Sequence, residues 1–156
     1  MKQAQELRSV LDRRTWDKEV VLWQGSDKAL VEMLANLNAV SLDILDLLDQ
    51  NNLSTDDDDN KATIREAIRG YLKNLPKGPE HPCVLVVRSI GLLARYRIGL
   101  KEFYDWFVGS HAMVILVLGD LADPTGWPEE VRCDSNRLVE YFLEPGMVKE
   151  TYVAEG

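Results

Sequence analysis

Two short apolar runs in the second half of the chain constrain its fold most strongly. Cys83–Val87 and Met113–Leu118 contain no charged residue and are rich in β-branched side chains. Such runs are typical of strands that are buried on both faces of a parallel sheet. Parallel strands need crossover connections, and these are usually helices that then cover the sheet. The two runs therefore predict an α/β domain.

Strand and helix patterns alternate along the rest of the chain. Further strands are predicted at Val20–Trp23 and Ala39–Leu42, with a short edge strand at Val131–Cys133. Apolar spacing and capping residues predict helices from Leu7 to near Trp16, after Ser26 or Asp27, from Ile44 to Asp49, from Asn60 to Leu75, from Leu100 to near Gly109, and from Asp134 or Ser135 to Phe142. We expect one three-layer domain over residues 1–156, with a mostly parallel sheet of about five strands and helices on both faces. The polar segment 50–60, which contains the run Asp56–Asp59, is expected to be a mobile loop.

Composition narrows the class of protein. A chain of 156 residues with 46% hydrophobic content matches one ordinary domain. Its 26 acidic and 18 basic residues give a formal net charge of −8, which disfavours binding to nucleic-acid backbone. Cys83 and Cys133 are isolated, so neither a zinc site nor a disulfide framework is expected, and a reducing cytoplasm fits. No apolar stretch approaches the roughly 18 residues of a membrane span, so we expect no membrane contact.

The turn after the strand at Val20–Trp23 lies where a phosphate-binding loop would be. Such a loop needs several glycines, so that backbone N–H groups can surround phosphate, followed by Lys and Ser or Thr. This turn has the single glycine Gly25 and a carboxylate at Asp27 that would repel an anion. Gly25, Ser26 and Lys28 are the candidates for holding a nucleotide. The sequence favours the alternative, a plain turn in which Ser26 or Asp27 caps the next helix.

The order of these elements resembles the P-loop NTPase core of the RecA and AAA kind. In that resemblance, Val20–Gly25 occupies the Walker A strand and turn, and Cys83–Ser89 occupies the Walker B strand. Met113–Asp120 corresponds to the sensor strand and Val131–Cys133 to the last strand. The Walker lysine is missing, and Arg88-Ser89 stands where the family has its acidic residue for magnesium. The resemblance therefore does not carry over ATPase activity, and no cofactor is expected.

A second resemblance concerns the region around the same two buried strands. Val84–Tyr96, followed by Val114–Asp120, resembles P-loop-type subunits of bacterial BREX phage-defence systems, including the small BrxF-like proteins. This resemblance implies a role in a multi-protein assembly.

Five residues are candidates for contacting a partner. Arg88, Arg95 and Arg97 follow a buried strand, at the edge where open α/β sheets place their sites, and could hold phosphate or an acidic partner. The alternative is that they pair with the abundant carboxylates of this chain. Helical spacing leaves Trp106 as an expected exposed aromatic anchor, whereas the loop residue Trp127 either pins its loop or meets another chain.

Metal and catalytic motifs are absent from the sequence. Asp43, Asp46 and Asp49 are three residues apart, which a solvated helix face explains without a metal. His81 and His111 each precede a buried strand and belong to no HExxH or HxH motif. No GxSxG motif is present, so no catalytic residue is assigned.

The leading hypothesis is a non-catalytic interaction or scaffold subunit of a larger cytoplasmic complex, with a BREX-like phage-defence complex as the assembly that the resemblance suggests. Its partners would be other protein subunits, and a homo-oligomer is left open. One alternative is a nucleotide-binding ATPase or switch with an unorthodox phosphate loop. Another is an acidic adaptor or inhibitor of a DNA-binding protein.

Overall fold

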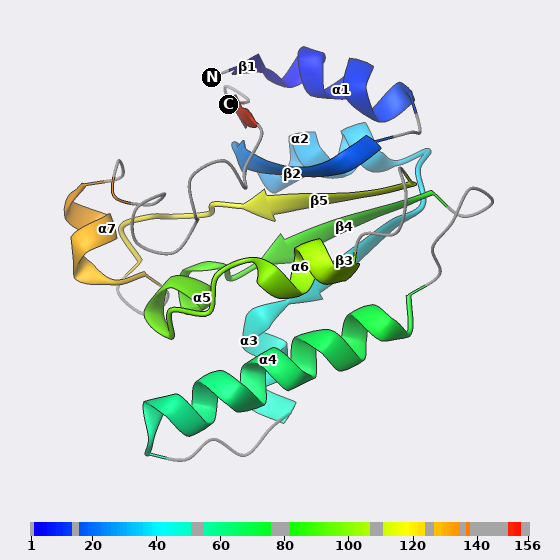
Figure 1. The fold of residues 1–156 in the computed structure, drawn as a ribbon. Coiled ribbons are helices and arrows are strands. Elements are labelled where there is room, and N and C mark those ends of the chain that lie inside the picture. The colour runs from blue at the N-terminus through cyan, green and yellow to red at the C-terminus, as the bar shows by residue number, and fades with distance from the viewer. Residues whose placement is uncertain are drawn as a thin grey trace.

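The computed structural model describes residues 2–13, 16–50, 55–75, 82–106, 111–123, 127–134, 137 and 150–153. These residues form a six-stranded sheet in the order β1-β6-β2-β5-β4-β3, and each neighbouring pair is parallel (Figure 1). The strands are β1 (Lys2–Gln3), β2 (Trp16–Gln24), β3 (Ala39–Asp43), β4 (Cys83–Arg88), β5 (His111–Val117) and β6 (Glu150–Val153). The helices are α1 (Ala4–Asp12), α2 (Asp27–Leu34), α3 (Ile44–Gln50), α4 (Asp57–Lys73), α5 (Gly91–Arg95), α6 (Lys101–Trp106) and α7 (Glu129–Cys133).

The two apolar runs form neighbouring strands at the centre of the sheet. β4 pairs with β5 in parallel, so that Leu85 lies beside Val114 and Val86 beside Ile115. Each of these four residues is at most 2% exposed. The sequence prediction of two central parallel strands is confirmed, and it holds because only strands covered on both faces have no need of polar side chains.

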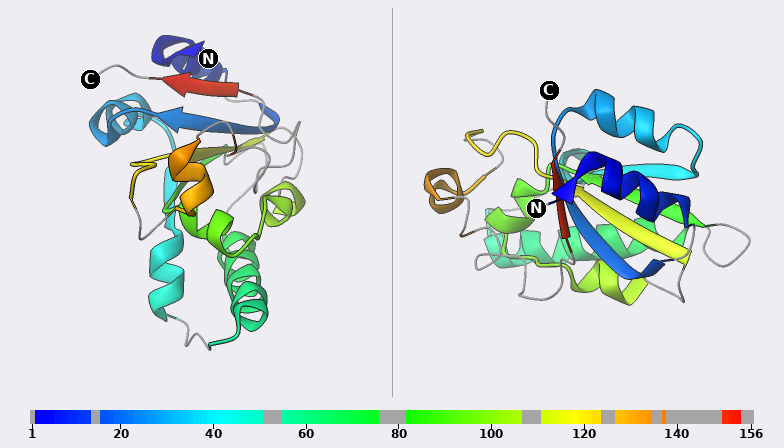
Figure 2. Two further views of the ribbon diagram at one scale, coloured as in Figure 1. Left: turned by 90° about the vertical axis from the view of Figure 1, so that its left-hand side faces the viewer. Right: turned by 90° about the horizontal axis from the view of Figure 1, so that it is seen from above.

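Helices cover both faces of the sheet, as predicted (Figure 2). Alternate residues of β4 point to opposite faces. Val84 and Val86 belong to the core cluster that contains residues of α1 and α2, whereas Leu85 and Val87 belong to the cluster that contains residues of α3 to α6. The chain is therefore a three-layer α/β domain in which both layers of helix shield the central strands from water.

Helix α4 begins earlier than the sequence predicted. The Asp56 carboxylate Oδ1 accepts the backbone N–H groups of Asp58 and Asp59 at 2.8 and 3.2 Å, and this caps the helix. Carboxylates in the first turn are favourable because they complement the positive end of the helix dipole. The expectation of a loop over Asp56–Asp59 is therefore wrong, and α3 also continues to Gln50. Residues 51–54 lie outside the described part of the chain.

The last strand is also placed differently from the prediction. Val131–Cys133, expected to be an edge strand, belongs to helix α7, which follows Pro128 as N-cap and carries two glutamates in its first turn. The sixth strand is instead β6, which lies between β1 and β2. The helix expected up to Phe142 falls largely outside the described residues.

The helices that the structure describes include none that is both long and apolar enough to span a membrane.

Candidate functional site

A pocket of about 490 Å³ lies at the carboxyl ends of β2, β3, β4 and β5. The chain leaves β2 through α2 on one face of the sheet and leaves β5 toward Trp127 and Val131 on the other face. Since β2 and β5 are neighbours, this edge is a topological switch point, which is where open α/β sheets bind their ligands. The volume is also within the range of small-molecule sites. We call it the carboxyl-end pocket and treat it as the candidate site.

The carboxyl-end pocket has an apolar floor and a charged rim. The buried lining residues include Ile90, Leu92, Leu118 and Trp127. The charged lining residues are Asp27, Asp43, Asp120, Asp123 and Arg88. The described lining thus contains four carboxylates and one guanidinium, and this excess of negative charge disfavours the entry of an anion.

The turn after β2 has the geometry of a helix cap. The Ser26 hydroxyl oxygen accepts the N–H of Ala29 at 3.2 Å, and the Ser26 carbonyl accepts the indole N–H of Trp23 at 3.3 Å. Ser26 is therefore the N-cap of α2, as one of the two sequence interpretations held. Gly25 lines the pocket, whereas Lys28 is exposed and is not among the lining residues.

An ion pair between α2 and β4 lies at the carboxyl end of β5. Asp27, the first residue of α2, accepts a hydrogen bond from the guanidinium of Arg88, the last residue of β4. Because β5 lies between β2 and β4, the pair spans the carboxyl edge of three adjacent strands. The side chains are 26% exposed for Arg88 and 68% for Asp27, so water reaches the pair and screens it. The charge of Arg88 is nonetheless matched by a carboxylate of the chain itself.

Of the other predicted partner-binding residues, Trp127 lines the carboxyl-end pocket together with Arg88, whereas Arg95, Arg97 and Trp106 do not. Arg95 and Arg97 are exposed and are not among the lining residues of the carboxyl-end pocket. Trp106 is 4% exposed, so the expectation of an exposed aromatic anchor is wrong. Trp127 is 5% exposed and lines the pocket, and its backbone N–H donates to the Asp123 backbone carbonyl at 3.1 Å. This hydrogen bond ties residue 127 to its own loop, and a contact of its side chain with another chain stays a prediction.

Ser89 carries backbone strain at the pocket. It follows β4 directly, lines the pocket and has a φ of 60°, in the left-handed region that residues with a Cβ avoid. This conformation costs about 1–2 kcal/mol relative to the right-handed one. Strained backbone of this kind concentrates at ligand sites, where the surrounding structure holds it in place.

No metal site emerges from the described residues. Among them, no three His, Cys, Asp or Glu side chains are grouped closely enough to hold an ion. Asp43 instead accepts the N–H of Leu45 at 2.9 Å, and Asp120 accepts that of Ala122 at 2.9 Å, so both carboxylates are engaged with backbone. His111 is the first residue of β5, and His81 and the side chain of Asp49 lie outside the described part.

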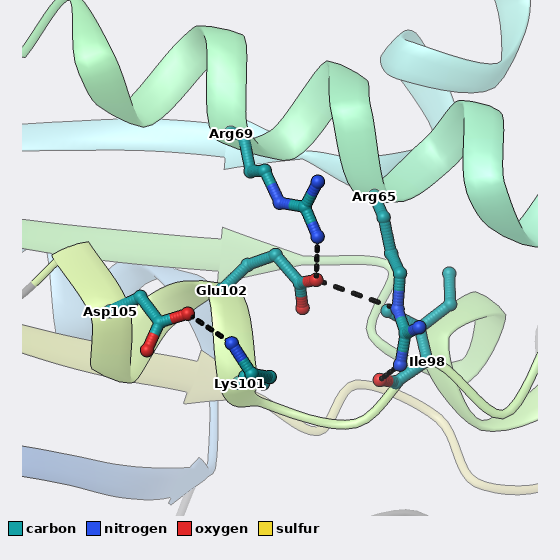
Figure 3. Close-up of polar contacts among 6 residues, drawn as sticks. All are labelled: Arg65, Arg69, Ile98, Lys101, Glu102 and Asp105. Carbon is teal, nitrogen blue, oxygen red and sulfur yellow. Dashed lines mark hydrogen bonds and ion pairs between the residues drawn. The ribbon is translucent and has the colours of Figure 1, made fainter.

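A buried carboxylate that the sequence did not single out joins α4 to α6 (Figure 3). Glu102 is 3% exposed, and its Oε1 lies 3.5 Å from Nε of Arg65 and 3.4 Å from Nη2 of Arg69. Arg65 also donates to the Ile98 carbonyl at 3.2 Å. The i, i+4 spacing of the two arginines is visible in the sequence, but their shared partner is more than thirty residues away.

Three side chains resist ionisation, which predicts a loss of stability in alkali. Burial raises the pKa of the Cys83 thiol above 9.0 and that of the Tyr104 phenol above 10.0, and for Tyr71 burial is the main cause, with the Cys83 charge adding to it. The unfolded chain ionises first, so this stability is complete below about pH 9 and is lost as pH rises through the folded-state values. Urea unfolding from about pH 8 to about pH 11 should show it. In Cys83→Val, the part of this loss of stability that begins at the lowest pH should disappear. An equal free energy of unfolding at about pH 8 and about pH 11 would contradict the burial of these side chains.

A scan of the sequence against protein-family models and a search of curated proteins gave no match.

Proposed function

We propose that this chain is a non-catalytic interaction subunit of a larger cytoplasmic assembly, with a core that resembles a P-loop NTPase but lacks its nucleotide chemistry. The Asp27–Arg88 ion pair is the observation that carries the proposal. It lies where the resemblance would put the phosphates of a nucleotide, between the turn after β2 and the end of β4. A subunit without that chemistry contributes binding surface to its assembly.

The physical reason is that the pocket presents negative charge at the usual anion site. The N-terminus of a helix attracts phosphate through its free N–H groups and its dipole. In α2, the Ser26 hydroxyl already engages one of these groups, and the Asp27 carboxylate adds a negative charge there. Arg88, the only cation lining the pocket among the described residues, is paired with that carboxylate. A nucleotide would therefore meet repulsion from the other three carboxylates of the described lining, without a free cation there to offset it.

Calorimetric titration with ATP and with GTP, each with and without magnesium, tests the proposal. We expect no heat of binding at micromolar nucleotide, because no group of the pocket compensates for the desolvation of the phosphates. An Asp27→Asn variant frees Arg88, but it leaves the three carboxylates Asp43, Asp120 and Asp123 and supplies no glycine-rich loop, so it should behave in the same way. Micromolar binding to the unmodified protein would contradict the proposal.

A nucleotide-binding switch is the second candidate, favoured by the pocket's position, its volume and the strained backbone at Ser89. The two candidates differ at Lys28. In a working phosphate loop the lysine neutralises phosphate charge, so its loss is severe. Lys28→Ala should abolish any nucleotide binding by the switch, whereas it should leave an interaction subunit unchanged, because Lys28 is an exposed residue of α2.

The phage-defence assignment rests on the BREX resemblance of the segments around β4 and β5. Affinity purification from the native host with mass spectrometry identifies the assembly, and genes for a methyltransferase, an ATPase and a phosphatase-like protein next to this one would support it. Co-purification with a stable complex unrelated to defence would overturn this part of the proposal and leave the interaction role intact.

A further inference from the structure

Helix α4 carries a row of cations on a chain whose net charge is −8. The row, which we call the α4 basic stripe, consists of Lys61, Arg65, Arg69 and Lys73. Residues four apart share one face of a helix, so the stripe runs for about 18 Å at about 1.5 Å of rise per residue. Neighbouring like charges at this spacing repel one another and destabilise the helix. Helix stability accounts for the two ends of the stripe, since Asp57 precedes Lys61 by four residues and Lys73 complements the dipole in the last turn. It does not account for the adjacent cations Arg65 and Arg69 in the middle.

The protein's own carboxylates offset only part of this charge. Figure 3 shows Arg65 and Arg69 converging on Glu102, whose single negative charge is shared between the two arginines. The neighbouring carboxylate on α6, Asp105, is paired with Lys101 at 2.6 Å and is not available to the stripe. Glu66 is an exposed residue of α4 three positions before Arg69, and no ion pair of the described residues joins it to the stripe. The stripe as a whole remains positive.

A small groove borders the C-terminal half of the stripe. It measures about 180 Å³ and lies between α4 and α6, where it is lined by Arg69, Leu72, Lys73, Glu102, Asp105 and Trp106. The Arg69 side chain is 59% exposed and its hydrogen bond to Glu102 uses only one of its five N–H donors. Lys73 is exposed beside it. The groove thus offers two cations, Arg69 and Lys73, and apolar walls at Leu72 and Trp106. Its two carboxylates, Glu102 and Asp105, are already paired with cations of the chain itself.

We infer that the α4 basic stripe and this groove dock an acidic segment of a partner protein, with one carboxylate held between Arg69 and Lys73. The inference rests on the proposed interaction role and names the chemistry of the partner. Glu102 acts here as a positioning residue, because its buried carboxylate holds Arg65 and Arg69 toward α6. A guanidinium held in this way loses less side-chain entropy on binding. It can donate two parallel hydrogen bonds to one carboxylate.

The surroundings of the stripe favour an acidic protein segment over nucleic acid. Asp56–Asp59 form the N-terminal cap and first turn of the same helix, so a phosphate backbone continuing beyond the stripe in that direction would meet like charge. The rest of the chain is acidic as well, and a long polyanion would be repelled outside the stripe. A protein segment with a few carboxylates can match the stripe and end there.

The test uses the full chain and two labelled alanine-based peptides, one with glutamate and one with glutamine at every fourth position. Fluorescence anisotropy at low ionic strength should show binding of the glutamate peptide alone, weakening as salt is added. Reversing both rim charges, with Arg69→Glu and Lys73→Glu, should weaken it about tenfold or more, because each reversal replaces attraction with repulsion. The control with the same change in net charge is the double reversal Arg8→Glu and Arg13→Glu, at two exposed cations of α1 and its C-cap across the sheet.

Three outcomes would overturn the inference: equal binding of both peptides, equal weakening by the α1 control and the rim variants, or tighter stripe-dependent binding of a DNA duplex than of the glutamate peptide. Circular dichroism must show that the variants are folded, and single reversals at Lys73 and at Lys61 give a graded series if the double variant is not. If the peptide test fails and the nucleotide titrations show no binding, only the proposed docking surface is refuted. If the protein binds nucleotide and also binds the glutamate peptide through the α4 basic stripe, only the proposed non-catalytic role is refuted.

Discussion

Val86→Asp is expected to unfold the domain. Val86 is 2% exposed in β4, between β3 and β5 in the sheet, and packs against the cluster that contains Leu30 and Ile115. The introduced carboxylate would be buried without a cation, which costs several kcal/mol, on the order of the total stability of about 5–15 kcal/mol. Circular dichroism during heating should show no cooperative transition, or one shifted far downward.

Val31→Asp is the matched control for this substitution. Val31 lies on α2 and is 58% exposed, so the same chemical change should alter the free energy of unfolding by about 0.5 kcal/mol or less. If both variants melted near the unmodified protein, the burial of β4 on the face covered by α1 and α2 would be refuted.

The central strands and α4 could be predicted because each has an unbroken pattern. Cys83–Val87 and Met113–Leu118 are apolar on both faces, and the row Ile64, Ile68 and Leu72 repeats with the helical period. These patterns are set by local burial and need no knowledge of distant partners.

The short elements depended on signals too weak to decide between helix and strand. Val131–Cys133 spans three residues, fewer than one helical turn, so its period is undefined. Pro128 and the acidic pair after it were the better guide, because proline and first-turn carboxylates favour the start of a helix. β6 and the two residues of β1 pair with each other at one side of the sheet, and such pairing depends on strands remote in sequence.

The candidate site could be predicted in position but not in charge. The carboxyl edge follows from the parallel sheet, and Arg88 at the end of a strand was placed there correctly. Its partner Asp27 is 61 residues away, and only the strand order brings the two together. The burial of Trp106 also depends on a distant segment. The helical spacing of α6 assigns it an outer face, but α4 packs over that helix and buries it.

Trp23→Ala should cause the second large loss of stability and test the link between the core and the pocket. Trp23 is fully buried at the end of β2, its carbonyl accepts the N–H of Leu118 at 3.0 Å, and its indole donates to the Ser26 carbonyl. Truncation of a buried tryptophan costs about 3–5 kcal/mol through lost burial and the cavity left behind. Urea unfolding followed by fluorescence remains usable, since Trp16, Trp106 and Trp127 are also buried.

Trp23→Phe separates the two contributions of this side chain. Phenylalanine keeps most of the apolar contact with the cluster around Leu30 but cannot donate to Ser26, so about 1 kcal/mol should be lost with the hydrogen bond, together with a smaller packing term. The Ser26 cap itself should persist, because its contact with the N–H of Ala29 does not involve the indole. A loss in Trp23→Phe as large as in Trp23→Ala would mean that the indole bond, and not burial, holds the turn of the carboxyl-end pocket. A loss below about 1 kcal/mol in Trp23→Ala would contradict the packing of this residue altogether.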